Sequence, residues 1–229
     1  MKQIPLGLAV QSLRSFDNFI AGANLAALEH LQALTNSSTP VYLWGPAGSG
    51  KTHLMQALAH RFRAGGVRVG WFSDADPLPW LHDEGRSLLV FDACESLSAE
   101  RQHAAFALLV QAADVGSTVV AAGRVPPVDL PLREDLRTRL AWGHVFALQP
   151  LSESDMRAAL RRESDHLGAF LPDEVMDYLL TRCERNLRHL TALLARLNEF
   201  SLAEKRMVTV PLLKQMLAEE EGSPGKTAP

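Results

Sequence analysis

Residues 41–52 read VYLWGPAGSGKT, and this stretch decides the fold. A short apolar run suited to a buried strand leads into a glycine-rich turn, and apolar residues then recur at helical spacing at Leu54, Leu58 and Phe62. The GxxxxGKT spacing in this strand, turn and helix context predicts a phosphate-binding loop. The alternative is an ordinary turn with a solvated lysine, which the complete spacing disfavours.

Each residue type in this stretch suits a bound nucleotide. Glycines let the backbone N–H groups of the loop point inward, and the helix that begins near Lys51 presents its own free N–H groups and positive dipole end. The Lys51 ammonium is expected near the β- and γ-phosphates, and the Thr52 hydroxyl is expected to ligate Mg²⁺. We therefore predict ADP or ATP with Mg²⁺ as cofactors, bound by Gly45, Gly48, Ser49, Gly50, Lys51 and Thr52.

Composition limits the classes of function. The chain has 229 residues, of which 47% are hydrophobic and 21% charged, so it can bury a core of one or two domains. A net charge of −3 gives no basic excess for tight DNA binding, so any role at DNA is expected to be indirect. Two cysteines far apart, Cys94 and Cys183, with neither a signal peptide nor a long apolar span, predict a cytoplasmic protein away from membranes.

Strands and helices alternate through residues 13–150. Apolar runs predict strands at 41–44, 68–73, 88–92, 117–123 and 145–148, and helical spacing predicts helices at 25–34 and 98–113. Asn24 is predicted to cap the first of these helices. Such alternation is typical of α/β folds, here a five-stranded parallel sheet flanked by helices.

The pattern changes at Leu151, after which every segment is predicted to be helical. Ser152 with Asp155 marks one helix start, Pro172 is expected as the first residue of a second helix, and further helices are predicted at 187–203 and 211–218. The predicted organisation is a tail at 1–12, a nucleotide-binding α/β domain at 13–150, a helical lid at 151–218 and a disordered tail at 219–229.

A carboxylate follows the third predicted strand. Asp92 is the expected partner of Thr52 at the Mg²⁺. The next position, where a second carboxylate normally polarises the attacking water, is Ala93. Glu95 is the alternative acid, but two residues further on it is expected to have turned away from the strand end. Loss of a general base typically lowers the rate by about 10²–10⁴-fold. We therefore predict at most weak intrinsic ATPase activity, with ADP as the resting nucleotide.

Two arginines outside the loop are candidates for phosphate contacts. Arg139 precedes the last predicted strand, and Arg188 begins a helix of the predicted lid. Guanidinium groups bind phosphate charge bidentately, either within one chain or from a neighbouring subunit. From spacing alone, solvated or ion-paired surface arginines remain the alternative.

The chain resembles the AAA+ module of the DnaA family of replication initiators. The resemblance rests on GPAGSGKT, on FDNFIAG at 16–22, on RTRLAWG at 137–143 and on an all-helical lid, and it covers residues 13–217. The chain ends where the initiator's helix-turn-helix domain would begin, and QPLS stands at 149–152. Both features favour a regulatory family member that inactivates DnaA over the initiator itself.

The resemblance implies roles for individual residues. Phe16 and Phe19 would line the adenine, Asp92 would hold the metal, Arg188 would occupy the sensor 2 position, and Arg139 would be the arginine finger. Two positions depart from the family pattern: Ala93 replaces the second Walker B acid, and Arg124 stands where a polar or acidic sensor 1 residue is expected.

The expected function is therefore negative regulation of replication initiation, with hydrolysis of ATP on DnaA promoted in trans. The N-terminal QIPLGL, residues 3–8, has the QxxLxL form of a peptide that docks on the DNA polymerase III sliding clamp, through Gln3, Leu6 and Leu8. A homo-oligomer is compatible with this function. The alternatives are an ATP-driven helicase loader or remodelling ATPase, and a DNA-binding initiator fragment.

Overall fold

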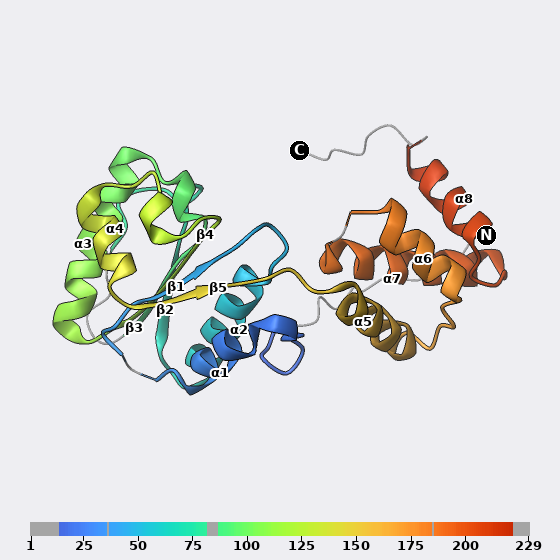
Figure 1. The fold of residues 1–229 in the computed structure, drawn as a ribbon, viewed down its shortest axis with the longest axis horizontal. Helices are drawn as coiled ribbons and strands as arrows, with labels where there is room; N and C mark the ends of the chain where they lie inside the picture. Colours follow the sequence, from blue (N-terminus) through green and yellow to red (C-terminus); the bar gives the residue numbers. More distant parts are fainter. Residues whose placement is uncertain (1–13, 36, 82–86, 185, 222–229) are drawn as a thin grey trace. The chain divides into compact units, whose positions relative to one another are not determined.

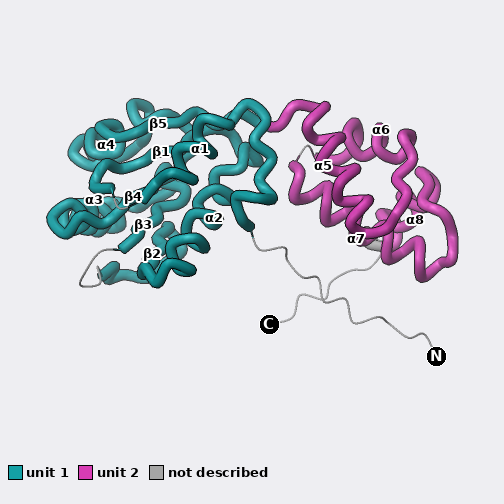
Figure 2. Tube along the Cα trace, turned by 90° about the horizontal axis from the view of Figure 1, so that it is seen from below, with its two compact units in different colours: residues 1–150 teal, residues 151–229 magenta. Residues whose placement is uncertain are grey.

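The computed structural model describes residues 14–35, 37–81, 87–184 and 186–221. The chain forms two compact units, residues 1–150 and 151–229 (Figures 1 and 2). The division falls where the sequence pattern changes from alternating strands and helices to helices alone. The predicted N-terminal tail, with Gln3, Leu6 and Leu8, lies outside the described residues.

Unit 1 is built on a parallel sheet. Its strands are β1 (Val41–Trp44), β2 (Arg68–Phe72), β3 (Ser87–Phe91), β4 (Thr118–Gly123) and β5 (His144–Ala147). Their order is β2-β3-β4-β1-β5, and every pair is parallel. This confirms the predicted five-stranded parallel sheet, in which β1 lies between β4 and β5 and carries the phosphate loop at its carboxyl end.

Helices cover both faces of this sheet (Figure 1). On one face lie α1 (Leu25–Ala33) and α2 (Lys51–Ala64), and on the other lie α3 (Ala99–Val115) and α4 (Glu134–Ala141). Short 3₁₀ turns occur at η1 (Gly22–Asn24), η2 (Cys94–Ser96) and η3 (Pro127–Asp129). The helix α4 was not among the predicted elements.

Alternate strand residues supply two separate cores. Leu88 and Val90 of β3 pack with α1 and α2, whereas Leu89 and Phe91 pack with α3 and α4. Successive side chains of a strand point to opposite faces, so a strand buried on both faces is a continuous apolar run. Of the described residues between β2 and β3 none is helical, and Trp80 from this segment packs on Phe72 and Phe91.

The predicted cap at Asn24 is wrong. Its side chain makes no cap hydrogen bond to α1. Instead the Asn24 amide donates to the Gln149 carbonyl oxygen (2.9 Å) and accepts from the Gln149 N–H (2.8 Å). This buried asparagine therefore joins the start of α1 to the segment that follows β5, because a paired amide satisfies donor and acceptor together.

Unit 2 consists, in its described part, of four helices. They are α5 (Glu153–His166), α6 (Asp173–Arg182), α7 (Leu187–Glu204) and α8 (Val210–Glu221), packed around leucines and methionines such as Leu160, Met176, Leu197 and Leu212. The predicted start at Ser152 is confirmed, since its hydroxyl oxygen accepts from the Asp155 N–H (3.1 Å).

Two predicted boundaries in unit 2 are wrong. Pro172 is not the first residue of α6 but its N-cap, with extended backbone and a carbonyl oxygen that accepts from Met176. Residues 219–221, expected to be disordered, continue α8; the remainder of that predicted tail lies outside the described residues. None of the helices among the described residues is long and apolar enough to cross a membrane.

We predict that Asn24→Ala destabilises unit 1 by about 1–3 kcal/mol, since two hydrogen bonds worth about 0.5–1.5 kcal/mol each are lost. Denaturant unfolding followed by tryptophan fluorescence measures this directly, because Trp44, Trp71, Trp80 and Trp142 all belong to unit 1. The control Asn198→Ala, on α7 of unit 2, is expected to leave this transition unchanged. Equal stability of Asn24→Ala and the parent chain would contradict the role assigned to Asn24.

Candidate nucleotide-binding site

The phosphate loop begins at Gly45, where three strands meet. The Gly45 N–H donates to the Gly123 carbonyl oxygen at the end of β4 (3.3 Å). On the other side, a Cβ at Gly45 would lie 2.2 Å from the Leu148 carbonyl oxygen, just after β5, and the residue has φ +151°. Only glycine fits this close approach of backbone to backbone. The loop is therefore fixed to both neighbours of β1.

Lys51 lies inside the curve of the loop. Its ammonium donates to the carbonyl oxygens of Gly45 (2.6 Å) and Pro46 (2.8 Å), and Ser49, also buried in the loop, lies near it. Burial lowers the pKa of Lys51, while the carboxylates of Glu95 and Asp92 oppose the shift. A half-buried ammonium at the first turn of α2, beside the N-terminal N–H groups of that helix, is suited to bind an anion.

Thr52 and Asp92 form the predicted metal-binding pair. The Thr52 hydroxyl donates to Asp92 Oδ2 (3.2 Å), although 40 positions separate the two residues. Among the described residues there is no cluster of three or more histidines, cysteines or carboxylates that could hold a metal ion. One hydroxyl and one carboxylate fit Mg²⁺, which usually takes few protein ligands and completes its shell with water and phosphate oxygens.

The chain turns sharply after Asp92. Ala93 has φ 51° and ψ 50°, a left-handed conformation that costs a residue with a Cβ roughly 1–2 kcal/mol. Its N–H donates to Asp92 Oδ1 (2.9 Å), and η2 follows at once. Buried Cys94, whose pKa burial raises to about 12, lies in this turn and is a core thiol, not a nucleophile.

The expectation that Glu95 points away from the strand end is wrong. The left-handed residue and η2 bring its side chain back over the end of β4, where Glu95 Oε2 accepts from the Arg124 N–H (3.2 Å). Glu95 Oε1 also lies 3.3 Å from Arg124 Nε. The carboxylate therefore lies at the same carboxyl edge of the sheet as the phosphate loop.

The two aromatic residues assigned to the adenine lie at different places. The Phe19 ring covers the loop: a Cβ at Gly50 would lie 2.7 Å from it, and it meets the His53 ring edge-on. The Phe16 ring instead packs under the guanidinium of Arg61, ten residues further along α2 than Lys51. Phe19 is thus the aromatic residue that the fold holds against the phosphate loop.

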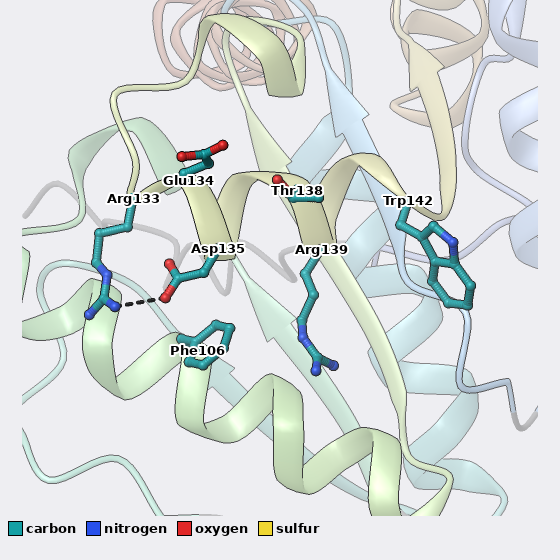
Figure 3. A pocket seen from close by; sticks show the side chains of 7 residues that line it. All are labelled: Phe106, Arg133, Glu134, Asp135, Thr138, Arg139 and Trp142. Carbon is teal, nitrogen blue, oxygen red and sulfur yellow. Dashed lines mark hydrogen bonds and ion pairs between the residues drawn. The ribbon is translucent and has the colours of Figure 1, made fainter.

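Arg139 projects from α4 beside an open depression of about 950 Å³ (Figure 3). Its guanidinium lies 5.7 Å from the centre of the Phe106 ring, which α3 supplies. Within the described part of the chain, Arg139 has no ion pair or hydrogen bond from its side chain. Trp142, 77% exposed, stands at the rim of the same depression. An arginine stacked on an aromatic ring is oriented while its N–H groups stay free for a ligand.

Sequence reasoning did not identify Phe106 or Trp142 as part of this face. The contact of Phe106 with Arg139 joins α3 to α4 across 33 positions of the sequence, so no local pattern indicates it. Arg188 lies in unit 2, exposed at the start of α7, where its backbone N–H donates to the Asn186 side chain (3.0 Å). Its assignment to a bound phosphate stays a prediction.

Two models of known protein families match the chain, one in each unit. The bacterial DnaA ATPase domain matches residues 10–71, and the lid domain of Hda matches residues 153–217. Among solved structures, domain III of DnaA from Thermotoga maritima has a TM-score of 0.73 at 21% identity, covering 91% of this chain and 97% of that one.

Two further solved structures share the fold at comparably low sequence identity. DnaA from Aquifex aeolicus, bound to AMPPCP, has a TM-score of 0.67 at 20% identity, covering 92% of this chain and 70% of that one. The Holliday junction branch migration motor RuvB of Thermotoga maritima has a TM-score of 0.68 at 17% identity, covering 90% and 72%. At these identities the likeness concerns the fold alone.

The fold and the site together define a AAA+ module. An inner strand, β1, carries the phosphate loop, an aspartate after β3 accepts a hydrogen bond from the threonine of that loop, and a helical unit follows the sheet. The matches in the two units support an Hda-like protein of the DnaA family of AAA+ proteins.

We predict that Lys51→Ala abolishes binding of ADP, because the variant lacks the only ammonium that the described loop places among its carbonyl groups. Isothermal titration calorimetry measures the loss. Lys214→Ala, on α8 of unit 2, serves as the matched lysine control and should bind like the parent chain. A Lys51→Ala protein that is folded by circular dichroism and binds ADP as tightly as the parent would contradict the assignment of the loop.

Proposed function

We propose that the chain regulates initiation of DNA replication by promoting hydrolysis of ATP bound to DnaA. The observation that carries the proposal is Arg139, an oriented guanidinium on an open face, with no ionic partner among the described residues. An arginine supplied by a partner stabilises charge that develops on the transferred phosphoryl group. The ATP on DnaA is the proposed target, and Arg139 is the residue that acts on it.

The face around Arg139 has the composition of a protein interface. Exposed Trp142 and half-buried Arg139 lie three residues apart at the end of α4, and Phe106 of α3 lines the same depression. Tryptophan and arginine are enriched among residues that dominate binding energy. The proposed partner for this face is the nucleotide-bearing side of DnaA. The phosphates of its ATP would be the negatively charged partner of the Arg139 guanidinium.

The chain's own phosphate loop is proposed to hold ADP or ATP with Mg²⁺. Support comes from the Lys51 contacts, from the Thr52–Asp92 pair and from the fold shared with AMPPCP-bound DnaA of Aquifex aeolicus. In this site Lys51 would contact the phosphates, Thr52 and Asp92 would hold the metal, Phe16 and Phe19 would lie toward the adenine, and Arg188 would approach from the lid. Bound ADP is the proposed resting state, since Ala93 lacks a carboxylate.

The match to the Hda lid domain supports this function over a helicase loader or remodelling ATPase. Those machines hydrolyse their own ATP repeatedly, and Ala93 stands where such a site has its second carboxylate. Localisation in the cytoplasm, with DnaA as partner, belongs to the same proposal.

The N-terminal residues 3–8 are proposed to dock on the DNA polymerase III sliding clamp. Gln3, Leu6 and Leu8 have the spacing of a peptide that fills an apolar pocket with a polar rim, and Pro5 lowers the entropy lost when the strip is fixed. Docking would raise the local concentration of the chain where a clamp is loaded on DNA, which explains an indirect role at DNA without a basic surface.

We predict that Arg139→Ala binds nucleotide and folds like the parent but stimulates hydrolysis by DnaA at least about tenfold less. Arginine fingers contribute about 10³–10⁵ in rate in GTPases, and a smaller effect is expected here. The measurement is phosphate release from ATP-loaded DnaA with clamp loaded on DNA. Arg137→Ala is the matched control, because position 137 lies on another side of the same short helix. Stimulation by Arg139→Ala equal to that by Arg137→Ala would refute the role of Arg139.

We predict that replacing Gln3, Leu6 and Leu8 together by alanine removes binding to purified clamp in a pull-down, because the apolar anchors and the polar contact are lost. Nucleotide affinity should stay that of the parent chain, since the phosphate loop is untouched. Clamp retained by the triple variant would show that another surface is the anchor.

A further inference from the structure

The end of β4 holds a carboxylate that the proposed function does not use. Glu95 Oε2 accepts from the Arg124 N–H, and Glu95 Oε1 pairs with Arg124 Nε. The Glu95 side chain is 21% exposed, whereas that of Arg124 is 72% exposed. A hydrogen bond from a backbone N–H and one ion pair therefore hold the carboxylate in place, and part of the side chain remains exposed to solvent.

Gly123 makes room for this carboxylate. A Cβ at position 123 would lie 2.1 Å from the Tyr42 hydroxyl oxygen and 3.1 Å from Glu95 Oε2. The Tyr42 hydroxyl donates to the Val125 carbonyl oxygen (3.0 Å) and so fixes the chain just beyond. The missing side chain at Gly123 thus admits the Glu95 carboxylate to the top of β4.

The same residue fixes Glu95 relative to the phosphate loop. The Gly123 carbonyl oxygen accepts from the Gly45 N–H at the start of that loop. In agreement, burial lowers the pKa of Lys51 and the Glu95 carboxylate opposes this shift more strongly than Asp92 does. Glu95 is therefore the second carboxylate at the phosphate edge of the sheet, beside the one that meets Thr52.

We propose that Glu95, three positions after the aspartate assigned to the metal, partly replaces the missing carboxylate at position 93 and polarises water for slow hydrolysis of ATP on this chain, which leaves ADP in the site. The inference rests on the nucleotide binding proposed above. Ala93 contributes through its backbone, because the left-handed turn returns the chain to the sheet edge within three residues. Glu95 is not part of the Thr52–Asp92 pair assigned to the metal, since Asp92 is the carboxylate that accepts the hydrogen bond from Thr52.

The proposed step is a simple hydrolysis. The oxygen of a water molecule forms a bond to the γ-phosphorus, and the bond from that phosphorus to the oxygen of the β-phosphate breaks. The water proton passes to the Glu95 carboxylate and from there to solvent. The products are ADP and inorganic phosphate, and no further reactant is required.

Arg124 restrains this base. While Glu95 Oε1 is paired with Arg124 Nε (3.3 Å), that oxygen is not available to accept a proton from water. The pair is exposed on the arginine side, and such pairs are worth about 0.2–1 kcal/mol. Removal of the guanidinium is expected to raise the rate of hydrolysis by about 1.4–5-fold. This factor is the energy of the ion pair converted into a change of the activation barrier. The backbone N–H of residue 124 would still orient Glu95 in that variant.

The test is steady-state ATPase activity of the full chain without DnaA, together with calorimetric titration of ADP. We expect Arg124→Ala to hydrolyse ATP faster than the parent. Glu95→Gln, which keeps an oxygen for the Arg124 N–H, should lower hydrolysis on the order of 10²-fold while ADP still binds. The double variant Glu95→Gln/Arg124→Ala should be as slow as Glu95→Gln alone. Arg161→Ala, which breaks a surface ion pair with Asp173 in unit 2, is the control and should leave the rate unchanged.

Two results would overturn the inference. If Glu95→Gln binds ADP and hydrolyses ATP at the parental rate, Glu95 is not the base, although nucleotide binding stands. If Arg124→Ala hydrolyses ATP no faster than the parent, the Arg124 guanidinium does not restrain Glu95. A parent chain that binds no nucleotide would instead refute the proposed function on which the inference rests, so the two failures are told apart by the titration.

Discussion

The structure depends on the close backbone contact at Gly45. There β1 leads into the phosphate loop, and backbone from both neighbouring strands approaches it, with the Gly123 carbonyl oxygen on one side and that of Leu148 on the other. A side chain at this position would collide with backbone, which cannot yield as a flexible side chain can. The contact sets the height of the loop relative to β4 and β5, and so determines which residues can reach a phosphate.

Two carboxylates at this edge have different partners. Asp92 accepts a hydrogen bond from the Thr52 hydroxyl, and this is the pair predicted to hold Mg²⁺. Glu95 is instead held by the end of β4 and by Arg124. Arg139 belongs to another surface altogether, where the Phe106 ring orients it. The phosphate edge of the sheet and the face around Arg139 are therefore separate surfaces of unit 1, as the proposed function requires.

Much of the fold follows from local pattern in the sequence. The apolar runs at β1, β3 and β4 and the spacing from Gly45 to Thr52 need no distant information, because a parallel sheet buried on both faces imposes them residue by residue. The Ser152 cap is equally local, since donor and acceptor lie three positions apart. The five-stranded parallel sheet and the Thr52–Asp92 pair are therefore predictable.

The remaining features depend on partners distant in sequence or on an unusual backbone. Asn24 reads as a helix cap, yet Gln149, 125 positions away, takes both of its hydrogen-bonding groups. The left-handed conformation of Ala93 has no signal in the sequence, because alanine avoids it, and the return of Glu95 to the sheet is hidden with it. The helix α4 was missed because it is short, and its contact with Phe106 joins residues far apart in the sequence.

The central claim is that the chain acts on ATP held by DnaA, and the most direct measurement follows that ATP alone. DnaA would be preloaded with γ-labelled ATP, mixed with this chain carrying unlabelled ADP and with clamp loaded on DNA, and labelled phosphate would be followed through a single turnover. The account predicts a rate that rises with the concentration of this chain and saturates. Release at the rate of DnaA alone, at every concentration of the chain, would contradict it.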